Sequence, residues 1–81
     1  MKQLNLSYNR LLNSYRLSDS SESHVRPLVQ GTLAEALEPA RDIISHRKII
    51  LFLENIDDKN SQNIKKSLGS KRVTYKSRHS H

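Results

Sequence analysis

The chain has 81 residues, a net charge of +6, two glycines and no cysteine. A chain this short forms one small domain that buries only roughly 60 % of its unfolded surface. Without cysteine it has no disulfide scaffold and no thiolate metal site, and two glycines cannot build a glycine-rich phosphate loop. The sequence contains no apolar leader segment and no run of roughly 20 apolar residues, so we expect a soluble cytoplasmic protein.

The first segment predicts a helix. Residues 3–17 place an apolar stripe at helical spacing, although their Asn and Ser residues lower the helix propensity. The helix therefore needs a packing partner. The polar stretch 18–23 predicts a loop, with Ser23 as the N-cap of the next helix. The stripe consists of Leu4, Tyr8, Leu11, Leu12 and Tyr15.

Two amphipathic helices, at about 24–38 and 45–56, are expected to form the centre of the fold. In the first, apolar residues recur at i, i+3 and i+4, and Pro39 is expected to end it because proline disfavours helical geometry in the residue before it. Ser45 is a suitable N-cap for the second. The apolar stripe of the second helix is Ile49, Phe52, Leu53 and Ile56.

An alternative for the second of these helices stays open. A short apolar run such as residues 48–55 is also typical of a buried strand, because periodicity alone does not separate the two. Paired with residues 71–78, it would give an α+β fold. We favour the helix because the run continues to Ile56 without a turn signal.

Residues 57–69 predict a further short helix that is capped by Asp58 and ends at Gly69, with Ile64 and Leu68 on its narrow apolar face. Residues 70–81 predict a disordered basic tail, with an edge strand around Val73 and Tyr75 as the alternative. The predicted fold class is therefore all-α: a bundle of three or four short helices at 1–69, followed by a tail at 70–81.

Self-association is expected because so small a monomer has little apolar material with which to cover its two central helices. We predict a homodimer in which these side chains lie in or next to the interface. The predicted protein-interface residues are Leu28, Leu33, Leu37, Ile49, Phe52 and Leu53.

Catalytic and metal-binding patterns are not found in the sequence. The histidines do not follow metalloprotease spacing, and the acids at 35, 38 and 42 are typical of a solvated helix face. We therefore expect a non-enzymatic protein without a cofactor or a metal. The histidines are His24, His46, His79 and His81.

The charge is concentrated at the C-terminal end. Residues 1–58 carry seven Lys/Arg and eight Asp/Glu, whereas residues 59–81 carry seven Lys/Arg and no acid. Basic arms of this kind bind nucleic acid through phosphates with little sequence preference, or only add solubility. The predicted nucleic-acid-binding residues are Lys65, Lys66, Lys71, Arg72, Lys76 and Arg78.

The segment 14–56 resembles the small enterobacterial biofilm and acid-resistance regulators of the YmgB/AriR type. The resemblance rests on Val29, Gly31 and Leu37 in a first helix, a polar connection, and a basic pair before an apolar helix. It implies an all-α dimer that connects to a two-component response regulator. The matching basic and apolar residues are Arg47, Lys48, Ile49, Ile50, Leu51 and Leu53.

The leading functional hypothesis is thus a non-enzymatic regulatory or adaptor protein whose partner is another regulatory protein, with effects on biofilm and acid resistance implied by the resemblance. The alternative is a small nucleic-acid-associated protein that binds phosphates through its basic C-terminal segment.

Overall fold

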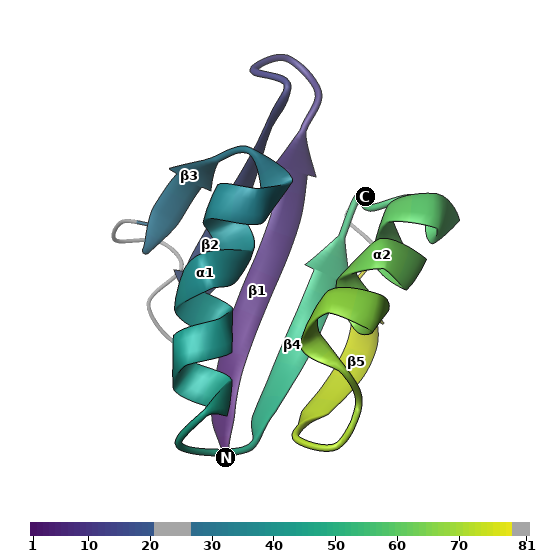
Figure 1. The fold of residues 1–81 in the computed structure, drawn as a ribbon. Helices are drawn as coiled ribbons and strands as arrows, with labels where there is room; N and C mark the ends of the chain where they lie inside the picture. The colour runs from purple at the N-terminus through teal and green to yellow at the C-terminus, as the bar shows by residue number, and fades with distance from the viewer. Residues whose placement is uncertain (21–26, 79–81) are drawn as a thin grey trace.

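The computed structural model describes residues 1–20 and 27–78. Within these ranges the chain forms one five-stranded sheet, in the order β3-β2-β1-β4-β5, and two helices. Both helices cover the same face of the sheet (Figure 1). The elements are β1 (Lys2–Asn9), β2 (Ser14–Asp19), β3 (Val29–Gly31), α1 (Leu33–Ile44), β4 (Ile49–Glu54), α2 (Asp58–Leu68) and β5 (Val73–Arg78).

The sheet is mixed. β1 pairs with β2 and β2 with β3 in antiparallel fashion, whereas β4 is parallel to β1 and β5 is parallel to β4. α1 connects β3 to β4, and α2 connects β4 to β5. Because β1, β4 and β5 run in one direction, their last residues lie at one edge, which we call the carboxyl end of the sheet. The β1–β2 hairpin extends beyond this edge (Figure 1).

The all-α prediction is wrong, and the first segment shows why. Residues 3–17 form most of the β1–β2 hairpin instead of a helix. Leu4 and Leu6 are fully buried on one face of β1, and their spacing of two residues is the period of a strand. The prediction missed this period because the apolar residues of the segment also fit a helical spacing. The chain reverses direction at Asn13, which has a positive φ of 49°. Asparagine tolerates this conformation better than most residues.

The first central helix is shifted from its predicted position. The predicted start at 24 lies outside the described residues, Val29–Gly31 form β3, and α1 runs from Leu33 to Ile44. A capping box fixes its start: Glu35 N donates to Thr32 Oγ1 at 3.2 Å, and Thr32 N donates to Glu35 Oε1 at 2.9 Å. Pro39 lies inside this helix and does not end it.

The second central helix is a strand. Ile49–Glu54 form β4, Ser45 is the C-cap of α1 and not an N-cap, and burial along β4 alternates strictly. The alternative kept open for residues 48–55 is the observed one, since β4 pairs in parallel with β5. The turn signal missed in the sequence is Asn55, whose φ of 58° ends the strand before Ile56.

The last segment agrees in part with the prediction. α2 spans Asp58–Leu68, its N-cap is Asp57 and not the predicted Asp58, and Gly69, at φ 77°, is its C-cap. Left-handed geometry at this position favours glycine. The disordered tail is wrong where the chain is described, because Val73–Arg78 form the edge strand β5. His79 and His81 lie outside the described residues.

The core lies between the sheet and the two helices. α1 contributes Ala36, Leu37 and Ala40, and α2 contributes Ile64. The sheet contributes alternate residues of its strands, namely Leu4, Leu6, Leu17, Ile49, Leu51, Leu53 and Val73. The opposite sheet face, on which no described helix or strand packs, is called the free face below. Its central row is Ser18, Asn5, Phe52 and Lys76, which are register neighbours on β2, β1, β4 and β5.

Candidate binding site at the carboxyl end of the sheet

The tip of the β1–β2 hairpin is braced by side-chain hydrogen bonds. Asn9 Oδ1 accepts from Leu11 N at 2.9 Å and from Leu12 N at 3.2 Å, which is an Asx turn. Across the hairpin, the Tyr8 hydroxyl donates to Asn13 Oδ1 at 2.5 Å. The loop Arg10–Asn13, which we call the hairpin tip, is therefore a braced projection.

Two leucines on this tip are exposed. Leu11 is 96 % exposed and Leu12 is 61 % exposed, so both present most of their apolar surface to water. Single exposed leucines are common on proteins and need no explanation. Two adjacent ones on a rigid projection are a different case, because contact residues are often carried on loops held by a rigid scaffold. The tip is thus a candidate contact surface.

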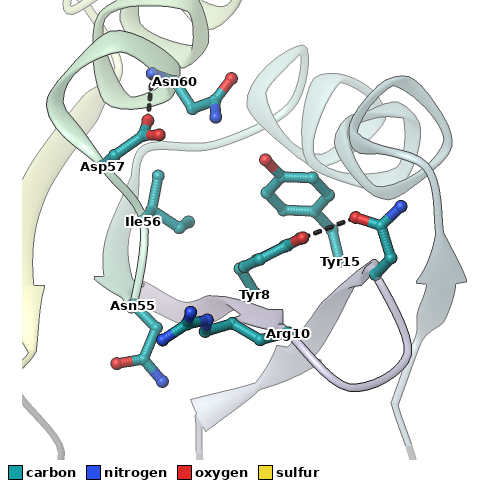
Figure 2. A pocket seen from close by; sticks show the side chains of 8 residues that line it. Tyr8, Arg10, Tyr15, Asn55, Ile56, Asp57 and Asn60 are labelled. Carbon is teal, nitrogen blue, oxygen red and sulfur yellow. Dashed lines mark hydrogen bonds between the residues drawn. The ribbon is translucent and has the colours of Figure 1, made fainter.

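A hollow lies between the base of the hairpin and the start of α2 (Figure 2). Its volume is about 510 Å³. The rings of Tyr8 and Tyr15 form one wall, with centroids 4.9 Å apart and planes tilted by 48°, a favourable geometry for an aromatic pair. The remaining lining residues are Arg10, Asn13, Asn55, Ile56, Asp57 and Asn60.

Some polar groups of the hollow are held by hydrogen bonds. Asp57 Oδ1 accepts from Asn60 N at 2.8 Å, so this carboxylate caps α2. Burial raises the pKa of the Tyr15 phenol, and the negative charges of Asp57 and of ionised Tyr8 raise it further. Tyr15 is therefore a neutral phenol at physiological pH and can both donate and accept a hydrogen bond.

Arg10 lines this hollow and two neighbouring ones. Figure 2 shows its side chain extending below the hollow toward Asn55. Two further hollows, of about 520 and 500 Å³, share Arg10 and Asn55 with the first. The carboxyl end of the sheet is thus a grooved surface around Arg10, with an apolar projection beside it. This arrangement of stacking, hydrogen-bonding and apolar groups is suited to binding.

The structure separates the predicted interface residues. Leu37, Ile49 and Leu53 are buried in the core of the monomer, with at most 7 % exposed. The expectation that the monomer cannot cover its predicted interface residues is therefore wrong for these three. Leu28 is 51 % exposed, and Leu33 and Phe52 are half-buried. Leu28 comes directly before β3, Leu33 is the first residue of α1, and Phe52 lies on the free face. These three residues do not form one patch.

The predicted nucleic-acid-binding cations are also divided. Lys65 and Lys66 lie in the last turn of α2, and Lys65 Nζ is 5.7 Å from the centre of the Tyr75 ring. Lys76 lies on the free face, and so does Arg78, the register partner of Glu54. The predicted residues therefore do not form a single basic arm.

The remaining two cations, Lys71 and Arg72, lie in the connection between α2 and β5. The Arg72 guanidinium donates to the carbonyl oxygens of Ile44 at 3.1 Å and Ser45 at 3.3 Å. These carbonyls are at the C-terminal end of α1, where a cation offsets the helix dipole. Arg72 thus has a structural role in the fold.

Sequence reasoning missed the residues of the hairpin tip. The sequence places Leu11 and Leu12 of the tip, and Tyr8 and Tyr15 beside it, on the apolar stripe of a predicted helix. The available signal was the pair Asn9 and Asn13 on either side of three residues, since asparagine favours turns and left-handed backbone.

Comparisons of this chain with protein-family models, with curated proteins and with solved structures gave no match. The all-α dimer implied by the resemblance to biofilm regulators has a different fold class from the observed sheet with two helices. Within residues 1–20 and 27–78, no three His, Cys, Asp or Glu side chains gather as a metal site would require. Neither of the described helices has the length and apolarity needed to cross a membrane.

Proposed function

We propose that this chain is a non-enzymatic binding protein that contacts a protein partner through the hairpin tip. The observation that carries the proposal is that Leu11 and Leu12 are exposed on a loop whose backbone is hydrogen-bonded to the Asn9 side chain. A rigid apolar projection loses little conformational entropy on binding, which is the usual advantage of a preorganised contact.

The residues of the tip define the chemistry of the partner. Leu11 and Leu12 fit an apolar pocket, because binding energy concentrates in side chains that become fully desolvated at the centre of an interface. Arg10, at the base of the tip, favours acidic groups at the rim of that pocket. The partner is therefore a protein with an apolar pocket and an acidic rim.

A second copy of the chain is one candidate for this partner. Its hollow combines the Tyr8 and Tyr15 rings and Ile56 with polar side chains, among them Asp57. The homodimer expected from the sequence stays a prediction, but the contact that supports it is now the tip of one protomer in the hollow of the other. Such a contact is small, and small interfaces are typical of weak, transient association.

The regulatory role is a proposal with narrower support. A connector to a response regulator, with effects on biofilm and acid survival in the cytoplasm, rests on the resemblance of residues 14–56 alone. The binding role itself does not depend on that resemblance.

The test compares two leucine substitutions in the full chain. A photo-crosslinking residue at position 11 should capture a protein that the same residue at position 28 does not. The captured protein is then purified and titrated against the wild type, against Leu11→Ser/Leu12→Ser, and against the matched control Leu28→Ser. We expect the double variant to bind the captured protein at least tenfold more weakly, which corresponds to about 1.4 kcal/mol of binding free energy. The affinity of the control should change little.

Sedimentation of the same variants distinguishes a second copy from another protein. Self-association that disappears in the double variant identifies the partner as a second copy. Equal binding by the wild type and the double variant, with the fold checked by circular dichroism, would contradict the proposal.

A further inference from the structure

The free face of the sheet combines one aromatic ring with flanking polar and basic groups. Its central row crosses four strands, and Phe52 has Asn5 on one side and Lys76 on the other. Sheets whose strands are parallel are usually covered on both faces. β1, β4 and β5 are parallel, yet in the described part of the chain helices cover only the other face.

The composition of this face decides which kind of partner could cover it. On β4 the free face presents Ile50 and Phe52, both half-buried. Their register neighbours are polar: Gln3 and Asn5 on β1, and Thr74 and Lys76 on β5. A helix or a second sheet packs through a continuous apolar face, which these residues do not provide.

Phe52 is already engaged in stacking. The Arg78 guanidinium lies 4.2 Å from the centre of the Phe52 ring, a cation–π contact. A guanidinium on an aromatic ring presents a flat surface, and unpaired bases stack both on aromatic rings and on arginine planes. Lys76, exposed beside the ring, places a second cation where a phosphate next to a stacked base would lie.

Asn5 gives a second, independent indication. The residue is 7 % exposed, and within residues 1–20 and 27–78 its Oδ1 atom has no hydrogen-bond partner. A buried polar atom without a partner costs stability, and a valine or isoleucine at this strand position would avoid that cost. An amide oxygen accepts hydrogen bonds from the edge of a base, and the buried Asn5 Oδ1 would do so once the side chains that cover it move aside.

We propose that the free face binds single-stranded nucleic acid, with a base stacked at Phe52 and Arg78 and the adjacent phosphates near Lys76. The inference is independent of the protein-binding role of the hairpin tip. A duplex fits this face poorly, because its bases are stacked on each other and are not available to Phe52. Glu54, the register partner of Arg78, opposes phosphate binding at that end of the face.

The experiment uses the full chain and fluorescein-labelled oligothymidylate, titrated by fluorescence anisotropy at several salt concentrations. At 50 mM salt we expect binding in the range of about 1–100 µM. Phe52→Leu should weaken it about tenfold, whereas Phe52→Tyr, which keeps the ring, should bind like the wild type. Glu54→Gln should tighten binding, because it removes a negative charge from the face.

The matched control separates this site from a diffuse basic segment. Lys76→Ala should lower the slope of log affinity against log salt by about 0.7, the value for one phosphate contact on a single strand. Lys66→Ala, which removes the same charge from α2, should leave the slope unchanged. Equal effects of these two variants, no effect of Phe52→Leu, equally tight binding of a duplex of the same length, or no binding at 50 mM salt would each overturn the proposal.

Discussion

β4 contributes to both faces of the sheet and shows how differently the two are built. Toward α1 and α2 it presents Ile49, Leu51 and Leu53, which are at most 7 % exposed. Toward the free face it presents Ile50, Phe52 and Glu54, all half-buried. Because hydrophobic stabilisation grows with the apolar area removed from water, the covered face supplies most of the stability. Residues on the free face are correspondingly less constrained by folding.

The strongest test of this difference substitutes two neighbours on β4. Leu51→Ala should lower the free energy of unfolding by about 2–5 kcal/mol, since it leaves a cavity in the core. Ile50→Ala, on the free face, should cost about 1 kcal/mol. Urea denaturation measures both. Equal losses would show that the two faces do not differ in this way.

A substitution at Asn5 should have the opposite sign. Asn5→Val removes the unpartnered Oδ1 atom from the free face and should raise the free energy of unfolding by about 1 kcal/mol. Ser7→Val, on the same strand and face, is the control for strand propensity and should give a smaller gain. If Asn5→Val destabilises the chain, the amide has a partner that this account omits.

The start of α1 allows a smaller test on the covered side. Thr32→Ala removes the side-chain half of the capping box and should cost about 1 kcal/mol. Thermal unfolding followed by circular dichroism measures this loss. No change in melting temperature would show that α1 does not depend on its cap.

The smallest expected effect is a pH dependence at Glu35. Two hydrogen bonds hold the pKa of this carboxyl below its ordinary value of 4.5. The larger effect comes from the Thr32 backbone and the smaller one from the Thr32 side chain. A lowered pKa in the folded state stabilises the fold above pH 4.5, and this contribution is lost as the pH falls through the folded pKa. The difference in stability between the wild type and Glu35→Gln should therefore shrink below pH 4.5. A difference that stays constant down to pH 3 would contradict the assignment.

Local signals in the sequence were sufficient for part of the fold. The end of α2 at Gly69 was predicted because caps are set by neighbouring residues. The hairpin of β1 and β2 was missed because Leu4, Tyr8 and Leu11 satisfy a helical period as well, and only pairing with β4 decides between them. Strand pairing is a non-local property that no short window of sequence contains.

The candidate sites were less predictable than the elements. The sequence identified Lys76 and Arg78 as cations, but it could not show that they share a face with Phe52, since that follows from the register of β4 and β5. Phe52 was predicted to be an interface residue for a different reason, as part of a helix stripe. Leu11 was predicted to lie on the apolar stripe of a helix, and only the hairpin shows that it is exposed.

The claim that the free face is a binding surface can be tested directly by nuclear magnetic resonance on the ¹⁵N-labelled full chain. Oligothymidylate should shift the amide signals of Asn5, Phe52 and Lys76 and the side-chain amide of Asn5, and should leave those of Lys65 and Lys66 on α2 unchanged. Shifts that follow the lysines and arginines on both sides of the sheet, with none at Phe52, would contradict the account.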